Sequence, residues 1–195
     1  MNPVLSRNNF LVREHVGLFK AASNYDIFDA QTGELLMECR EEQLGFFTKL
    51  LRFTDYKRMT PFHCVVRDTQ GNQVLRVSRG VAIFRSQVKV FNENDEWIGQ
   101  FRQRIFSIGG RFDVLDVNGQ YLCDLRGKWT SWEFYFERDG NELARVTKKW
   151  AGLTKEMFTS ADNYALIISE AVPPSSPLRQ LILAAVLCID LVLKE

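Results

Sequence analysis

The chain has 195 residues, of which 46% are hydrophobic and 12% aromatic, a composition typical of packed globular proteins and not of disordered ones. Its 25 basic and 24 acidic side chains leave a net charge of +1, so no whole-chain field attracts nucleic acid or an acidic membrane. We therefore expect one domain over residues 1–195 and no nucleic-acid partner.

One short pattern recurs five times along the chain: a strand-like run, a turn built on Asp, Asn or Gly, and a second strand-like run. The copies lie at residues 25–33, 65–71, 88–95, 112–119 and 134–140. Shorter strand-like runs lie at residues 10–12, 81–84, 104–106 and 164–168. Together they predict a mainly β protein of about twelve antiparallel strands, and a sheet of that length tends to curl or close.

Two dipeptides give the strongest turn signals, Asn118-Gly119 and Asp139-Gly140. Both supply the positive φ angles that a two-residue hairpin turn requires. We therefore predict a two-residue turn at each of these positions.

The runs beside the turns alternate between apolar and polar residues, as half-buried strands do. Tyr121, Cys123 and Leu125 are predicted to share the buried face of one strand, with Asp124 and Arg126 on its opposite face. One apolar and one charged face are typical of an antiparallel sheet that is wet on one side.

Residues 41–53 interrupt the β pattern with apolar residues at helical spacing. One interpretation is a short helix that covers one end of the sheet. The other is a helix that lies in a membrane interface, because four basic residues are close by: Lys49, Arg52, Lys57 and Arg58.

The C-terminal segment is the most apolar part of the chain. Ser176 and Pro177 suit the cap and first position of a helix. Residues 181–189, between Arg179 and Asp190, contain no polar side chain, so the helix is expected to be buried on all sides. Because a membrane span needs about 20 apolar residues, we favour a central core helix at 177–195 over a transmembrane one. A helix is about 10–12 Å wide, which suits the interior of a barrel too wide for its own side chains to fill.

Isolated cysteines and histidines argue against a metal site or a catalytic centre. The four cysteines form no CxxC pair, so we expect reduced, mostly buried thiols, with disulfides of a secreted protein as the alternative. The first residues contain no secretory signal, which favours a cytoplasmic protein. The sequence contains none of the common phosphate, hydrolase, zinc-protease or dinucleotide motifs, and we expect His15 and His63 to be structural. The sequence therefore predicts neither an enzyme nor a bound cofactor.

The C-terminal third resembles the phospholipid scramblase family. The resemblance is carried by a basic-Lys-Trp-x-Gly motif at residues 148–152, a Phe-Thr-x-Ala-Asp-Asn-aromatic motif at 158–164, and an apolar helix ending in Asp190 and Glu195. Residues 25–29, 61–62 and 66–71 also look like family positions. The resemblance implies a tubby-like fold, a closed antiparallel barrel of about twelve strands around a buried C-terminal α-helix. Plant LURP-one-related proteins are similar to this fold.

The family's proposed calcium segment is degenerate in this chain. The two Asp residues that begin and end it are replaced by Ser160 and Ala171, and the remaining oxygen donors are Asp162, Asn163 and Glu170. Calcium takes six to eight oxygen ligands, with carboxylates supplying the charge. We therefore expect weak calcium binding or none.

The resemblance implies a non-catalytic, lipid-associated role at the cytosolic face of a membrane, with phospholipid scrambling as the family activity. The candidate lipid-binding residues are Lys49, Arg52, Lys57, Arg58, Lys148 and Lys149. The alternative is a soluble tubby-like binding or signalling module for a phosphoinositide or a protein partner. A barrel carrier for an apolar ligand is disfavoured, because the helix would fill the cavity.

Overall fold

The computed structural model describes residues 1–15, 24–42, 60–81, 87–104, 111–128, 132–148 and 163–193. They form a short 3₁₀ helix, twelve strands and a C-terminal helix. In chain order these are η1 (Pro3–Ser6), β1 (Asn9–Glu14), β2 (Tyr25–Asp29), β3 (Leu35–Glu41), β4 (Phe62–Asp68), β5 (Gln73–Arg79), β6 (Gln87–Phe91), β7 (Trp97–Gln103), β8 (Phe112–Asp116), β9 (Tyr121–Lys128), β10 (Glu133–Arg138), β11 (Asn141–Thr147), β12 (Asn163–Ile168) and α2 (Pro177–Leu193).

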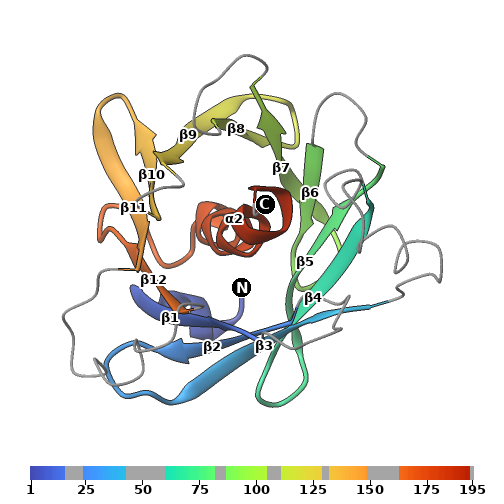
Figure 1. Cartoon of the computed structure of the whole chain (residues 1–195), viewed down its shortest axis with the longest axis vertical. Helices are drawn as coiled ribbons and strands as arrows, with labels where there is room; N and C mark the ends of the chain where they lie inside the picture. Colours follow the sequence, from blue (N-terminus) through green and yellow to red (C-terminus); the bar gives the residue numbers. More distant parts are fainter. Residues whose placement is uncertain are drawn as a thin grey trace.

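The twelve strands form a closed antiparallel barrel in which each strand pairs with its neighbours in the chain (Figure 1). Strand β1 closes the barrel, because Phe10 pairs with Asp29 of β2 on one side and with Leu166 of β12 on the other. Closure leaves no sheet edge exposed. The predicted fold class is therefore confirmed. Of the shorter predicted runs, residues 82–84 and 105–106 lie outside the described part of the chain.

The five sequence repeats are the five tight hairpins of the barrel, and all five turns lie at the same end, here called the turn end. Four of the turns begin with an Asp or Asn side chain that accepts hydrogen bonds from backbone N–H groups ahead of it, as Asx turns do. These residues are Asp29, Asp68, Asn92 and Asp116. The fifth turn, at Asp139-Gly140, has positive φ at both residues and is the predicted two-residue turn.

The prediction of a two-residue turn at Asn118-Gly119 is wrong. Gly119 has a φ of 76°, but Asn118 does not have a positive φ. The turn is longer and begins at Asp116, whose side chain accepts hydrogen bonds from the backbone N–H groups of Asn118 (2.8 Å) and Gln120 (2.8 Å).

Each of the five hairpins also contains a β-bulge, near the start of its second strand. In all five the register slips by one residue past an apolar side chain: Leu36, Val74, Ile98, Leu122 and Leu143. All five side chains pack against the core. Because a bulge bends and twists its strand, five bulges at one end help the sheet to close.

The bulge at Leu122 overturns one predicted strand face. Cys123 and Leu125 face the core as expected, but Tyr121 is 43% exposed. Cys123 pairs with Val114 and Tyr121 pairs with Leu115, so the extra residue between them reverses the alternation. Tyr121 therefore lies on the outer face of the barrel.

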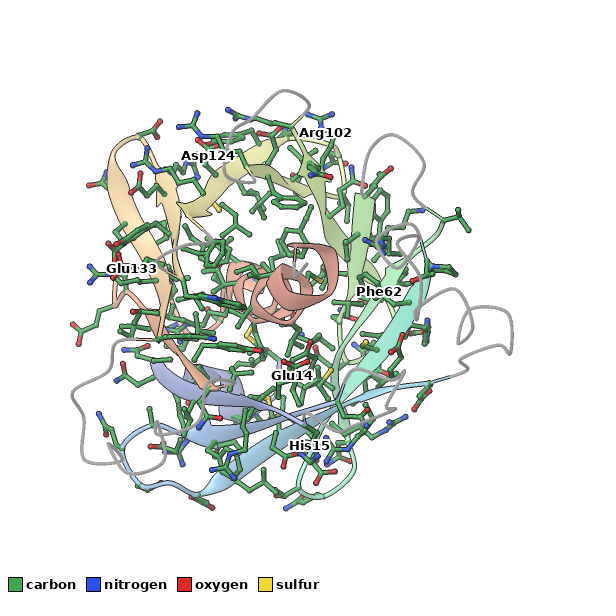
Figure 2. All side chains as sticks on the ribbon, in the orientation of Figure 1. Glu14, His15, Phe62, Arg102, Asp124 and Glu133 are labelled. Carbon is green, nitrogen blue, oxygen red and sulfur yellow. The ribbon has the colours of Figure 1, made fainter. Side chains whose placement is uncertain are left out.

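Helix α2 fills the barrel (Figure 1), and side chains from the surrounding strands point inward around it (Figure 2). Its residues Leu181 to Ile189 are all buried, which confirms the expected core helix. The hydroxyl oxygen of Ser176 accepts a hydrogen bond from the N–H of Leu178, 3.3 Å away, as a helix cap does. Within the described residues, no helix combines the length and the apolar character that a membrane crossing requires.

A buried arginine fixes the helix at the turn end. Arg179 is 1% exposed, and its guanidinium donates to the carbonyl oxygens of Leu5 (3.0 Å), Arg7 (2.8 Å) and Val172 (2.8 Å) and to Oδ1 of Asn8 (2.7 Å). Burial lowers the pKa of Arg179, and these oxygens replace the water that burial removes. Arg179 therefore ties the helix to the N-terminal segment and to the loop that precedes α2.

All four cysteines are free and buried, as expected. Burial raises the pKa of Cys123 to about 12 and also raises that of Cys188. The pKa of Cys64 is raised by a hydrogen bond with Cys39 and by burial. Thiols with raised pKa values are poor nucleophiles, so these three cysteines are inert structural residues.

A charge placed on the inner helix should unfold the protein. Ala184 is fully buried, so Ala184→Arg introduces a charge without a partner and is expected to cost about 3 kcal/mol or more of unfolding free energy. Ser175→Arg, in the exposed loop before the helix, should change it by less than about 0.5 kcal/mol. Urea unfolding of the two variants measures both effects. Equal stabilities would contradict the buried position of α2.

The turn carboxylates should make stability fall in acid. Burial raises the pKa of Asp29, but hydrogen bonds from the N–H groups of Thr32 and Gln31 and the nearby Arg7 outweigh it, so its pKa is lowered. A lowered pKa means that Asp29 stabilises the fold above its unfolded value of about 3.9, and that this contribution is lost as pH falls below it.

The substitution Asp29→Asn tests this contribution. The variant should be less stable than wild type at pH 7, because it loses the charge that pairs with Arg7. Its unfolding free energy should also fall less steeply between pH 4.5 and pH 3, when measured by urea titration at each pH. Identical slopes for the two proteins would exclude this role of Asp29.

Candidate functional site

The end of the barrel opposite the turn end carries the other six connections, of which all but the one between β9 and β10 are longer than the tight turns, and we call it the long-connection end. These connections join β1 to β2, β3 to β4, β5 to β6, β7 to β8, β9 to β10 and β11 to β12. Because strands alternate in direction, all six connections leave and re-enter the barrel at this one end. Helix α2 enters at the turn end and points toward the long-connection end.

A lysine at this end lies over a pair of stacked aromatic rings. Lys148 directly follows β11, and its Nζ lies 3.8 Å from the centre of the Trp132 ring and 5.9 Å from that of Tyr164. The Trp132 and Tyr164 rings are stacked, with centres 5.7 Å apart, and Phe134 meets Trp132 edge-on. A cation over an indole ring is stabilised by about 0.5–2 kcal/mol, so this contact holds the ammonium in place.

Trp132 has an unusual backbone conformation at this contact. Trp132 precedes β10 and has a φ of 50°, which is uncommon for a bulky residue. Such a conformation costs about 1–3 kcal/mol and persists where its surroundings enforce it. The stacking on the buried Tyr164 of β12 provides such surroundings.

A second basic residue anchors the β3–β4 connection where it returns to the barrel. Arg79 is 3% exposed, donates to the carbonyl oxygen of Thr60 (2.6 Å) and lies 4.8 Å from the centre of the Phe62 ring. Phe62, labelled in Figure 2, begins β4. The point at which this connection re-enters is therefore fixed by a buried hydrogen bond.

Three of the predicted site residues lie in the described part of the chain: Lys148, Asn163 and Glu170. Lys148 is placed at the long-connection end, as given above. The others, Lys49, Arg52, Lys57, Arg58, Lys149 and Asp162, lie outside the described residues. So does most of the predicted helix at 41–53, whose first residue, Glu41, is the last residue of β3.

Two of the three remaining calcium donors, Asn163 and Glu170, lie in the described part of the chain, and they lie far apart. Asn163 begins β12 and is buried, whereas Glu170 lies beyond the other end of this strand and is exposed. The rise of a β-strand separates Asn163 from Ile168 by about 16 Å, and Glu170 follows two residues later. Within the described residues, no group of three or more His, Cys, Asp or Glu side chains is placed to hold a metal ion.

His15 has a partner that its sequence neighbours do not reveal. Its Nε2 lies 2.6 Å from Oδ2 of Asp26, and Arg40 donates to the other oxygen of Asp26 (2.8 Å). Burial raises the pKa of Asp26, but the hydrogen bonds from Arg40 and His15 outweigh it, so its pKa is lowered. The contact forms because Arg13 pairs with Asp26 in the sheet, which places His15 beside it. The cluster joins β1, β2 and β3.

The interior next to α2 has little free space. A cavity between the helix and β6–β9 has a volume of about 10 Å³ and is lined by apolar residues that include Phe101, Phe112 and Ala185. That volume is at or below the smallest space that holds one water molecule. This cavity therefore cannot receive a lipid chain.

Calcium should bind weakly or not at all. We expect isothermal titration calorimetry to give a dissociation constant in the millimolar range or no measurable heat, because two carboxylates of the family segment are Ser160 and Ala171 here. The separation of Asn163, which begins β12, from Glu170, which lies beyond the other end of the strand, adds to this expectation. Micromolar binding that disappears in Asp162→Ala would contradict it.

Comparison with known proteins adds a family and a fold. A family model described as Scramblase matches residues 5–195. The X-ray structure of a protein from Arabidopsis thaliana is similar over 97% of this chain and 94% of its own, with a TM-score of 0.53 and 15% sequence identity. At that identity the similarity concerns the fold alone. A search of curated proteins found no match.

Proposed function

The chain belongs to the Scramblase family, and we propose that it has a non-catalytic, lipid-associated role at the cytosolic face of a membrane. It contacts phospholipid headgroups through basic residues and associates with the membrane surface peripherally. Phospholipid scrambling is the activity that the family name suggests.

One observation carries the proposal: the six candidate lipid-binding residues belong to two chain connections at the same end of the barrel. Lys49, Arg52, Lys57 and Arg58 lie in the β3–β4 connection, and Lys148 and Lys149 in the β11–β12 connection. Lys and Arg near an anionic membrane surface each contribute about 1 kcal/mol of attraction. Two basic segments at one end can therefore act on one surface together.

The proposed role needs no covalent chemistry. Scrambling moves a headgroup across a bilayer and breaks no bond. A headgroup would need a polar path, and the barrel interior beside α2 is apolar and filled. If this protein scrambles lipids, the path runs outside the barrel or between protein and lipid.

The second candidate is a soluble module that binds a phosphoinositide. The observation that favours it is the Lys148 ammonium, which is held over Trp132 and could donate hydrogen bonds to a phosphate group. This candidate shares the headgroup chemistry of the first but does not need a membrane surface. Binding of a short-chain, water-soluble phosphoinositide without binding to vesicles would favour it.

Vesicle flotation tests the proposal. The purified protein should float with vesicles of phosphatidylcholine and phosphatidylserine more than with phosphatidylcholine alone, and binding should weaken as salt shortens the screening length. Lys49→Glu/Arg52→Glu should reduce binding about tenfold or more, since each reversal removes one attraction and adds one repulsion.

The control keeps both charges. Lys49→Arg/Arg52→Lys should float like wild type. Equal flotation of the charge-reversed and the charge-keeping variants would exclude these residues as headgroup contacts. A protein that resists extraction from membranes by high salt and carbonate would contradict peripheral association.

A further inference from the structure

An apolar strip crosses the outer face of four neighbouring strands, β6 to β9, which lie side by side in Figure 1. In the described part of the chain five large hydrophobic side chains are exposed, and three of them belong to this strip: Trp97 (39%), Val117 (42%) and Tyr121 (43%). Exposed apolar residues that occur singly are ordinary, whereas a cluster of them marks an interaction surface.

Strand pairing makes the strip continuous. Phe91 of β6 pairs with Trp97 of β7, and Leu115 of β8 pairs with Tyr121 of β9. Residues that pair directly lie on the same face of a sheet. The register between β7 and β8 places Val117 beside the start of β7. The strip therefore runs across all four strands close to the turn end, and all of it lies in the described part of the chain.

The two exposed aromatic rings are held in fixed positions. The indole N–H of Trp97 donates to the carbonyl oxygen of Gly99, 2.9 Å away. Burial raises the pKa of Tyr121, as does the nearby Asp124, with which its hydroxyl forms a hydrogen bond. Rigid amphipathic rings lose little conformational entropy when a partner covers them, which suits them to an interface.

The β6–β7 hairpin places opposite charges on the two sides of the strip. Glu96, in the tight turn, directly precedes Trp97, and Lys89 lies two residues before Phe91, toward the other end of the hairpin. Both charged residues are exposed, and neither has an ion-pair partner among the described residues. Lys89 lies 5.4 Å from the centre of the Trp97 ring, and Glu96 accepts a hydrogen bond from Nδ2 of Asn92 (2.7 Å). The strip thus has an acidic border toward the turn end and a basic border on its other side.

Other charges around the strip pair within the chain. These pairs are Arg76–Asp95, Arg102–Asp113, Arg104–Asp113 and Arg104–Asp124, and Figure 2 labels Arg102 and Asp124. Lys89 and Glu96 are therefore the charges that the strip offers to a partner.

We propose that this strip is the interface of a homodimer, in which a second copy of the chain packs its own strip against it about a two-fold axis perpendicular to the sheet. Such an axis makes the two β6–β7 hairpins antiparallel, so that Glu96 of each copy meets Lys89 of the other. A surface of one charge sign, such as an anionic membrane, would match one border of the strip and oppose the other. The net charge of +1 gives little repulsion between copies.

The size of the strip sets the strength of the dimer. Four strands of five to eight residues form a face about 20 Å long and about 20 Å wide, or roughly 400 Å². Because specific interfaces of standard size bury about 800 Å² per partner, this interface is small and the dimer should be weak. We expect a dissociation constant of roughly 10–100 µM.

Sedimentation equilibrium of the purified chain tests the dimer. Between about 1 and about 500 µM, the weight-average mass should rise from that of one chain toward that of two. Val117→Glu and Val81→Glu form a matched pair, because both replace an exposed valine with the same charge and Val81 lies at the long-connection end. Val117→Glu should raise the dissociation constant about tenfold or more, and Val81→Glu by less than about twofold. A monomer at every concentration, or equal effects of the two variants, would overturn the proposal.

A mixture of two charge variants tests the two-fold contact. Lys89→Glu and Glu96→Lys should each weaken self-association about fivefold or more, because each brings like charges together across the axis. An equimolar mixture should associate about as strongly as wild type, since each variant then supplies the charge that the other lacks. A mixture that associates no better than the single variants would exclude the antiparallel contact. Circular dichroism and thermal unfolding show whether the variants are folded.

The other possible occupant of the strip is a lipid surface. If the chain stays monomeric and Val117→Glu reduces its flotation with phosphatidylcholine vesicles, the strip faces lipid and the dimer is excluded. The sedimentation experiment contains no lipid, so failure of the proposed membrane role leaves its result unchanged.

Discussion

The width of a twelve-strand barrel is the constraint on which the rest of the structure depends. Its own side chains cannot meet across the interior, so another apolar element has to fill it. Helix α2 does so, and the fit is close: a Cβ atom added to Gly99 of β7 would lie 3.1 Å from Cδ2 of Leu181. Because β12 closes the barrel against β1 and ends at the turn end, the chain needs only residues 169–176 to bring the helix inside.

Filling the barrel creates a second requirement at the turn end, where polar helix residues are also buried. Arg179, which precedes the apolar segment of the helix, is buried, and its acceptors include carbonyl oxygens near the start of the chain. Gln180, 2% exposed, likewise donates to the carbonyl oxygen of Val74 (3.0 Å) and to Glu93 (2.8 Å). Residues far apart in sequence supply these partners, so local patterns could not reveal them. The helix is thereby held at a fixed depth.

The sequence predicts the features that depend on nearby residues, and it misses those that depend on how distant strands pair. The Asp, Asn and Gly residues of the turns predict the five hairpins, and the continuous apolar run predicts the buried helix. Both predictions succeed because these features depend on residues that are close together in the chain. The bulges depend on register, and one of them turned Tyr121 outward. The candidate site is harder to predict from the sequence than the fold. Lys148 was chosen for its charge, but its position over Trp132 depends on the pairing of Glu133 with Thr147. His15 and Asp26 meet for the same reason.

The acidic residues at the turn end follow from the same turn chemistry: Asp29, Asp68, Asp116 and Asp139 all lie at hairpin turns. Asp and Asn are favoured in tight turns because their side chains accept hydrogen bonds from backbone N–H groups. In this barrel every second connection is a tight turn, so the five tight turns lie at one end. Acidic residues therefore collect there, and a near-neutral chain must carry its basic excess elsewhere. The helix follows the same polarity, since its N-terminus, the positive end of its dipole, lies at the acidic end. The near-zero net charge of the chain therefore does not describe the charge at the turns, which the topology gathers at one end.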